Sequence, residues 1–262
     1  MDTTQLFSLK DRTALVTGGS RGIGRMIAEG FVAQGARVYI SSRKADACDR
    51  TAAELSAGGG TCISLPMDVS TVDGARALAA AYAAREPGLD ILVNNAGAAW
   101  LTAFDDFPEK GWDKVMDLNV KSPFFVTQAL AGSLRAAARK DRPAKVINIA
   151  SIDGIYLTPR ETYSYAASKS ALIQLTRMMA ANLVKDGIVV SAIAPGPFAS
   201  DMNVYARDHE AETAAKVPLQ RIGTDLDMAG AAIFLASRAG DYVVGSVVTV
   251  DGGIAFASSP AR

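Results

Sequence analysis

The chain is poor in the residues on which many catalytic and structural sites depend. Its 262 residues include only two cysteines and a single histidine. Cys48 and Cys62 are too few for a disulfide framework or a cysteine-rich metal cluster, and we interpret them as reduced thiols. With His209 as the sole histidine, neither a Ser-His-Asp triad nor a multi-histidine metal site is expected. The sequence therefore predicts a protein without a metal centre.

The chain also lacks an excess of either charge and any long apolar run. Its 27 Lys and Arg residues are balanced by 27 Asp and Glu residues, which argues against a nucleic acid or a membrane surface as the main partner. No run approaches the ~20 apolar residues that a membrane helix needs. The start, Met1 to Gln5, lacks the positive segment and apolar stretch of a signal peptide. We therefore predict a cytoplasmic protein without nucleic-acid or membrane partners.

Short apolar runs alternate with longer helical patterns along the chain. The expected strands are Thr13–Val16, Arg37–Ile40, Cys62–Leu65, Ile91–Val93, Val146–Ile149, Val189–Ala192 and Val247–Val250. The expected helices are Gly22–Gln34, Ala45–Ser56, Asp73–Arg85, Trp112–Arg139, Thr162–Lys185 and Asp225–Ala236. Strands that are apolar throughout belong in a sheet covered on both faces, and strand–helix alternation makes that sheet parallel. We predict an α/β fold in which residues 1–262 form one domain, with a single doubly wound parallel sheet and helices on both faces.

A glycine-rich turn follows the first expected strand and opens the first expected helix. Glycines permit a tight turn and a close approach of the backbone to a pyrophosphate, and the helix N-terminus attracts its negative charge. An ordinary strand–helix turn is the alternative interpretation. The residues expected to contact a dinucleotide here are Gly18, Ser20, Arg21, Gly22, Ile23 and Gly24.

The end of the second expected strand bears on which nicotinamide cofactor is bound. Asp or Glu at this point accepts a hydrogen bond from the ribose of NAD, whereas Arg suits the 2′-phosphate of NADP. Here Arg43 and Lys44 follow the strand, no acid occurs before Asp46, and Arg21 adds a second cation. The alternative is that these cations are simply solvated at a helix start, where positive charge is slightly unfavourable. We predict NADP(H) in preference to NAD(H), with Arg43 reading the phosphate.

A tyrosine and a lysine share one face of a later helix. Tyr165 and Lys169 are four residues apart, and a nearby ammonium favours the phenolate over the phenol. Tyr163 is the competing candidate, but its fourth neighbour is Ala167, which cannot assist. Ser151 follows an expected strand at the edge where ligands bind. Polar residues that converge at one sheet edge indicate a site.

These motifs together resemble the short-chain dehydrogenase/reductase family, from about Leu9 to Gly253. The resemblance is carried by the glycine-rich turn, Asp68-Val69, Asn94 to Gly97, Asn119, Ser151, Tyr165 with Lys169, and Pro195-Gly196. It implies a Rossmann fold and a hydride transfer between NADP(H) and an alcohol or carbonyl.

The resemblance also implies a role for each catalytic residue. Tyr165 is the general acid in reduction and the base in oxidation, while Lys169 lowers its pKa and holds the nicotinamide ribose. Ser151 hydrogen-bonds the substrate oxygen, and Asn119 holds a water between Lys169 and solvent. The further cofactor contacts that it implies are Asp68, Val69, Asn95, Ala96, Gly97, Pro195, Gly196, Phe198 and Ser200.

The substrate is less closely defined. Ser151 lies 14 positions before Tyr165, one more than in much of the family, and the extra residue falls in the loop 153–160. The chain resembles most the 3-oxoacyl-carrier-protein reductases of the type associated with rhamnolipid synthesis. A carrier protein is acidic, so its docking needs a basic surface. The candidate basic residues are Arg135, Arg139, Lys140 and Arg142, which are equally explained as a complement to a helix dipole. Asp186 stands where those reductases tend to carry a basic residue.

Other substrates and one other class of function stay open. Sugars, polyols, steroids and small ketones are alternative substrates, and a non-catalytic NADP(H)-binding regulator is the alternative class, although such a regulator has no need of Tyr165. A lid is expected at about 197–218, with His209 exposed on it. Apolar helix faces in 112–131 and 173–183 favour a homodimer or homotetramer. The expected pocket walls are Trp100, Ile155, Tyr156, Tyr163, Phe198, Met202 and Tyr205.

Overall fold

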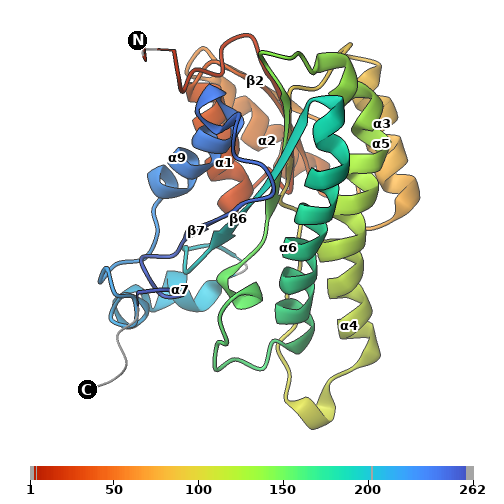
Figure 1. The fold of residues 1–262 in the computed structure, drawn as a ribbon. Helices are drawn as coiled ribbons and strands as arrows, with labels where there is room; N and C mark the ends of the chain where they lie inside the picture. The colour runs from red at the N-terminus through yellow and green to blue at the C-terminus, as the bar shows by residue number, and fades with distance from the viewer. Residues whose placement is uncertain (1–2, 4, 202, 258–262) are drawn as a thin grey trace.

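Seven short runs of mostly aliphatic residues pair into one parallel sheet in the computed structural model, which describes residue 3 and residues 5–201 and 203–257 (Figure 1). The strands are β1 (Thr13–Thr17), β2 (Arg37–Ser41), β3 (Thr61–Ser64), β4 (Ile91–Asn94), β5 (Ala144–Ile149), β6 (Ile188–Pro195) and β7 (Val247–Val250). Their order is β3-β2-β1-β4-β5-β6-β7, and every neighbouring pair is parallel. The order reverses between β1 and β4, the point where such sheets bind ligands. The predicted fold class is confirmed.

Helices cover both faces of this sheet. They are α1 (Gly22–Ala33), α2 (Ala45–Ser56), α3 (Val72–Ala83), α4 (Glu109–Met116), α5 (Ser122–Ala137), α6 (Tyr163–Leu183), α7 (Val204–Asp208), α8 (Glu210–Ala214) and α9 (Asp225–Ala236). Helices α1, α2 and α9 lie on one face, and α3, α5 and α6 lie on the other (Figure 1). Phe31 and Met228 pack in the first core, and Leu78 and Leu130 pack in the second. None of the helices in the described part of the chain is long and apolar enough to cross a membrane.

The single helix expected over residues 112–139 is wrong in one respect. The helical path there is divided into α4, a π-helical turn at Asp117–Lys121, and α5. The amide of Ser122 donates to the carbonyl of Asp117, five residues back, which is the π pattern. Asn119 lies in this turn and is buried. The bulge matters for function because Asn119 is one of the predicted catalytic residues.

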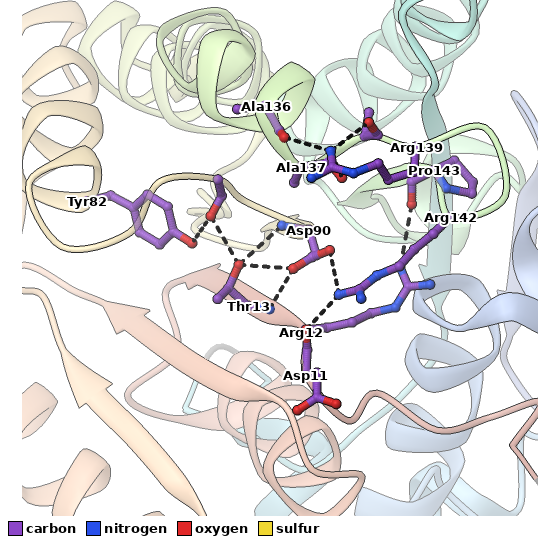
Figure 2. Close-up of polar contacts among 12 residues, drawn as sticks. Asp11, Arg12, Thr13, Tyr82, Asp90, Ala136, Ala137, Arg139, Arg142 and Pro143 are labelled. Carbon is purple, nitrogen blue, oxygen red and sulfur yellow. Dashed lines mark hydrogen bonds and ion pairs between the residues drawn. The ribbon is translucent and has the colours of Figure 1, made fainter.

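A dense polar network lies at the amino edge of the sheet, opposite the carboxyl ends of the strands (Figure 2). Asp90, just before β4, accepts hydrogen bonds from the Thr13 amide at 2.9 Å, the Thr13 hydroxyl at 3.2 Å and the Arg142 guanidinium at 2.9 Å. Arg12 is buried beside them, and its pKa is lowered first by burial and then by repulsion from Arg142. One carboxylate therefore joins the starts of β1 and β4 to the loop before β5.

Three of the four basic residues expected to offer a docking surface, Arg135, Arg139 and Arg142, make contacts within this amino edge. Arg139 donates to the last carbonyls of α5, those of Ala136, Ala137 and Ala138, and so complements the helix dipole (Figure 2). Arg135 pairs with Asp186 at 2.8 Å, and Arg142 with Asp90. The cluster lies away from the carboxyl edge, so it does not support docking of an acidic carrier protein at the ligand side of the sheet.

Candidate active site

The glycine-rich turn between β1 and α1 is built to admit a ligand close to its backbone. Gly18 and Gly22 have positive φ angles of 66° and 51°, which glycine adopts without strain. A Cβ atom on Gly24 would lie 2.3 Å from the Gly18 carbonyl oxygen. Helix α1 begins after Arg21 with no side-chain cap and no acidic residue in its first turn. Its first amide groups are therefore suited to a phosphate anion, and the turn fits a dinucleotide.

Two side chains hold this turn in place, and Thr17 among them escaped the sequence analysis. The Thr17 hydroxyl accepts from the amides of Asn95 and Ala96 at 3.0 and 3.1 Å, and donates to the Val93 carbonyl at 3.2 Å. The Asn95 side chain donates to the carbonyls of Thr17 at 2.9 Å and Gly18 at 3.1 Å. These bonds join the ends of β1 and β4. The side chain of Asn95 therefore braces the turn, and its expected contact with a cofactor stays a prediction.

The two cations expected near the 2′-phosphate have different surroundings. Arg43 is exposed at the end of β2 and forms no ion pair with any residue that the structure describes. Arg21, in contrast, pairs with Asp201 at 2.8 Å. Asp68 is exposed and accepts from the Ser70 amide, whereas Val69 is buried in the core. Arg43 is thus free to bind an anion, while Arg21 already has a partner.

The predicted catalytic pair, Tyr165 and Lys169, lies at the start of α6. Lys169 is buried, its ammonium nitrogen lies 5.5 Å from the centre of the Tyr165 ring, and it donates to the Ile149 carbonyl at 2.7 Å. Burial lowers the pKa of Lys169 to about 8, although the nearby Asp153 carboxylate opposes the shift. The predicted Tyr–Lys pair is therefore brought together at the end of β5, with the lysine mostly charged at neutral pH.

The pKa of Tyr165 differs from the expectation. Burial raises it to about 12, a hydrogen bond with Ser151 opposes the rise, and the charges of Asp153 and Arg160 respectively raise and lower it. The lowering expected from Lys169 does not appear, because removal of the phenolate from water outweighs the favourable contacts. The phenol is protonated at neutral pH, which suits a general acid. Asp153 and Arg160 were missed, although charged residues between Ser151 and Tyr165 are a signal visible in the sequence.

Asn119 and Ser151 are each held by hydrogen bonds to neighbouring segments. The Asn119 oxygen accepts from the Ala98 amide at 2.8 Å, and its nitrogen donates to the Ala98 carbonyl and the Ser168 hydroxyl, both at 2.9 Å. Asn119 therefore braces the loop after β4 against α6, and its expected role with a water stays a prediction. The Ser151 hydroxyl accepts from the Asp153 amide at 3.1 Å. This bond fixes Ser151 at the start of a 3-10 turn, η3 (Ile152–Gly154).

The other residues expected at the cofactor also follow the carboxyl ends of strands. Gly97 approaches Asn119, Pro195 ends β6, and the Ser200 hydroxyl accepts from the Asn203 amide at 3.1 Å. Gly196 packs so closely that an added Cβ would lie 2.7 Å from the Asp251 Cα. Their positions agree with one site along this edge, and their contacts with a cofactor stay predictions.

The expected pocket walls are only partly exposed. Ile155 and Tyr156, which follow η3, and Tyr205 of α7 are exposed, and Leu157 is 92% exposed. Phe198 is wrong as a wall, because its ring is buried in the core against Gly223, which leaves only its backbone for a ligand.

Two other residues expected as pocket walls or proton donors pack against their neighbours. Trp100 packs its ring closely against Gly111 of α4. Tyr163 packs on Phe104 and Phe107, and its hydroxyl donates to Glu161 at 3.4 Å, while the choice of Tyr165 as the catalytic tyrosine stays a prediction. Met202 lies outside the described residues. The segment expected to form a lid contains two short helices, α7 and α8, and His209 between them is exposed and stacks on Tyr205.

Comparisons with known proteins place this arrangement in a family. The family described as enoyl-(acyl carrier protein) reductase matches residues 18–255. The chain is 50% identical over 250 residues to a rhamnolipids biosynthesis 3-oxoacyl-[acyl-carrier-protein] reductase of Pseudomonas aeruginosa, covering 94% of this chain and 97% of that protein.

Two solved structures are also similar. The Pseudomonas aeruginosa RhlG/NADP active-site complex is 47% identical, with a TM-score of 0.93 and coverage of 96% of this chain and 99% of that one. A gluconate 5-dehydrogenase of Burkholderia cenocepacia in complex with NADP and tartrate is 34% identical, with a TM-score of 0.89 and coverage of 97% and 98%. With the Tyr165, Lys169 and Ser151 cluster beside a dinucleotide-binding turn, the chain belongs to the short-chain dehydrogenase/reductase family of oxidoreductases.

Proposed function

We propose that this protein reduces the ketone of a 3-oxoacyl thioester to an alcohol, with NADPH as the reductant. The observation that carries the proposal is the grouping of Tyr165, Lys169 and Ser151 after β5: the buried Lys169 ammonium lies 5.5 Å from the centre of the Tyr165 ring and donates to the carbonyl of Ile149, two residues before Ser151. The 50% identity to a 3-oxoacyl-[acyl-carrier-protein] reductase over nearly the whole chain supports the substrate class.

Side chains of this protein account for the proton transfer and for the stabilisation of charge in this reaction. NADPH, when bound, supplies the hydride to the carbonyl carbon. The hydroxyls of Ser151 and Tyr165 donate hydrogen bonds to the carbonyl oxygen, and the Tyr165 proton passes to that oxygen as negative charge develops. The ammonium of Lys169 then stabilises the phenolate that is left. A carbonyl thus becomes an alcohol, with the hydride from the cofactor and the proton from Tyr165.

The surface beside this cluster supports an apolar substrate. Ile155, Tyr156 and Leu157 lie in the loop between Ser151 and Tyr165, and Val204 and Tyr205 begin α7. All five side chains are exposed. An acyl chain that covers them removes apolar surface from water, at about 25 cal/mol per Å².

A substrate screen tests the proposal. Turnover with NADPH is measured on 3-oxoacyl thioesters of increasing chain length, and on keto sugar acids and aromatic ketones. We expect kcat/KM to rise with the length of the acyl chain. Turnover restricted to sugar acids would reject the thioester proposal while leaving the reductase assignment intact, and NADPH binding without any turnover would favour a regulator.

Sugar acids are the second candidate substrates because of one observation. Arg160 lies near enough to Tyr165 to lower its pKa, and near enough to Tyr205 to do the same there. It forms no ion pair with any described residue. A cation near the proton donor suits a carboxylate, although Arg160 also acts on the charge of Asp153, and the Burkholderia cenocepacia gluconate 5-dehydrogenase structure holds tartrate. The screen decides between the two classes.

Replacement of Arg43 tests the cofactor assignment. We expect Arg43→Ala to weaken NADPH binding by about 5- to 10-fold and NADH binding by less than about twofold, because a charge-assisted bond to phosphate is lost only for NADPH. Fluorescence titration measures both affinities. Arg50→Ala is the matched control, since Arg50 is an exposed cation of α2. Equal losses for both cofactors would remove Arg43 from phosphate recognition.

The pH dependence of reduction tests the role of Lys169. Tyr165, with a pKa of about 12, stays protonated throughout the working range, whereas Lys169 loses its charge above about pH 8. We expect kcat/KM for NADPH to be flat below pH 8 and to fall about tenfold per pH unit above it. In Lys169→Arg, whose cation does not titrate, the fall should disappear even if the rate is lower. A fall that persists unchanged in this variant would contradict the assignment.

Location and assembly belong to the same proposal. We propose that the protein is cytoplasmic. We also propose that it is a homo-oligomer, because α4, α5 and α6 expose the apolar side chains of Trp112, Phe124 and Met178. Analytical ultracentrifugation measures the assembly, and a monomer across micromolar concentrations would reject it.

A further inference from the structure

An ion pair joins the cofactor turn to a segment far away in the sequence. Arg21, at the start of α1, donates from Nη1 to Oδ2 of Asp201 at 2.8 Å, across 180 positions of the chain. Asp201 follows Ser200, and an added Cβ on Gly22 would lie 3.3 Å from the Ser200 Cβ. The segment after β6 thus packs directly against the turn. Both charged groups are exposed, at 72% for Arg21 and 50% for Asp201, so solvent and mobile ions reach the pair.

The surroundings of Asp201 contain charges of both signs. Its second oxygen accepts from Arg207 at 3.2 Å, and Arg207 also pairs with Asp208 at 2.8 Å. A cleft of about 230 Å³ separates α1 from this segment. It is lined by Arg21, Gly22, Arg25, Met26, Glu29, Ala199, Ser200, Asp201 and Asp225. Asp201 therefore keeps an ion pair with Arg207 when Arg21 moves away.

We propose that Asp201 competes with the 2′-phosphate of NADP(H) for the guanidinium of Arg21, and so limits how strongly the protein prefers NADP(H) over NAD(H). The inference rests on the proposed function, in which NADPH is the cofactor, and on the expected position of Arg21 near its 2′-phosphate. Arg43 is free to meet the phosphate at once, whereas Arg21 must first leave Asp201. NADH carries no 2′-phosphate, so its binding leaves the ion pair in place. The free energy needed to separate Arg21 from Asp201 therefore weakens the binding of NADP(H) and not that of NAD(H).

The size of the effect follows from the exposure of the pair. Exposed ion pairs contribute little to stability, so freeing Arg21 should change affinity by about three- to fivefold rather than by orders of magnitude. Mobile ions screen exposed charges. The change in NADPH affinity should therefore become smaller as the salt concentration rises from about 0.05 M to about 0.5 M.

The experiment compares cofactor affinities of four variants by fluorescence titration. In Asp201→Asn we expect NADPH to bind about three- to fivefold more tightly, with NADH changed by less than about 1.5-fold. Asp208→Asn removes the same charge from the same segment without touching Arg21, and should leave both affinities nearly unchanged. Arg21→Ala should weaken NADPH, and Asp201→Asn should have no further effect in that background. Calorimetry with 2′,5′-ADP, which carries the phosphate but no nicotinamide, should reproduce this ranking.

Each result has one meaning. Tighter NADPH binding in Asp201→Asn that disappears in the Arg21→Ala background supports the competition. No gain in Asp201→Asn, while Arg21→Ala still weakens NADPH, overturns the competition and leaves the cofactor assignment standing. Equal gains for NADPH and NADH, or the same gain in Asp208→Asn, overturn it in favour of a general charge effect. An Arg21→Ala variant with unchanged NADPH affinity overturns both the competition and the assigned role of Arg21.

Discussion

Replacement of Tyr165 by phenylalanine is expected to lower turnover by at least about 100-fold while NADPH affinity stays within about twofold. The pKa of the Tyr165 phenol is raised to about 12, which keeps its proton in place at neutral pH. Phenylalanine keeps the ring that packs near Lys169 and removes the hydroxyl group together with its proton. Turnover and fluorescence titration, measured on the same preparation, separate the two effects.

Tyr163→Phe is the matched control for this prediction. Tyr163 lies on the same helix turn, but its hydroxyl donates to Glu161 and its ring packs on Phe104 and Phe107. We expect this variant to turn over within about threefold of the wild type. Wild-type turnover in Tyr165→Phe, or an equal loss in the two variants, would remove Tyr165 from proton transfer.

Replacement of Asp90 by asparagine is expected to lower the free energy of unfolding by about 2–4 kcal/mol. Asp90 is buried and accepts three hydrogen bonds, from the amide and hydroxyl of Thr13 and from Arg142 (Figure 2). Asparagine leaves the positive charge of Arg142 unbalanced beside the buried Arg12, whose pKa the Asp90 charge already helps to raise. The cost is reduced from that of a fully buried pair because the Arg142 side chain is 38% exposed.

Urea denaturation measures this loss, with Asp11→Asn as the control. Asp11 is exposed, has a positive φ of 61° that asparagine also tolerates, and contributes its backbone carbonyl rather than its carboxylate to Arg142. We expect its replacement to change stability by less than about 0.5 kcal/mol. If Asp90→Asn proved equally mild, the network would contribute no more than a surface ion pair.

The local part of the site could be predicted from the sequence. Gly18, Gly22 and Gly24 are close together in the sequence. Glycine is required there because the turn that they form has positive φ angles and leaves no room for a Cβ atom. Tyr165 and Lys169 are placed on one face by helix geometry alone. The parallel sheet follows from apolar strands that alternate with helices, and its carboxyl edge gathers the polar residues that follow each strand.

Long-range packing decided the rest. The π turn at Asn119 depends on hydrogen bonds to Ala98 and Ser168, and the upward pKa shift of Tyr165 depends on how much water its neighbours exclude. Neither the π turn nor the exclusion of water from Tyr165 can be predicted from the spacing of residues along the chain.

The sequence by itself determined the α/β fold, the family and the Tyr–Lys pair, because strand and helix periodicity and close spacing act locally. Only the tertiary structure decided that Phe198 is core, that Arg139 and Arg142 serve the amino edge, and that Arg21 is held by Asp201. Charge partners and burial are set by which segments meet in space. In Arg21 and Asp201 those segments meet across 180 positions, a distance over which pattern in the sequence carries no information about contact.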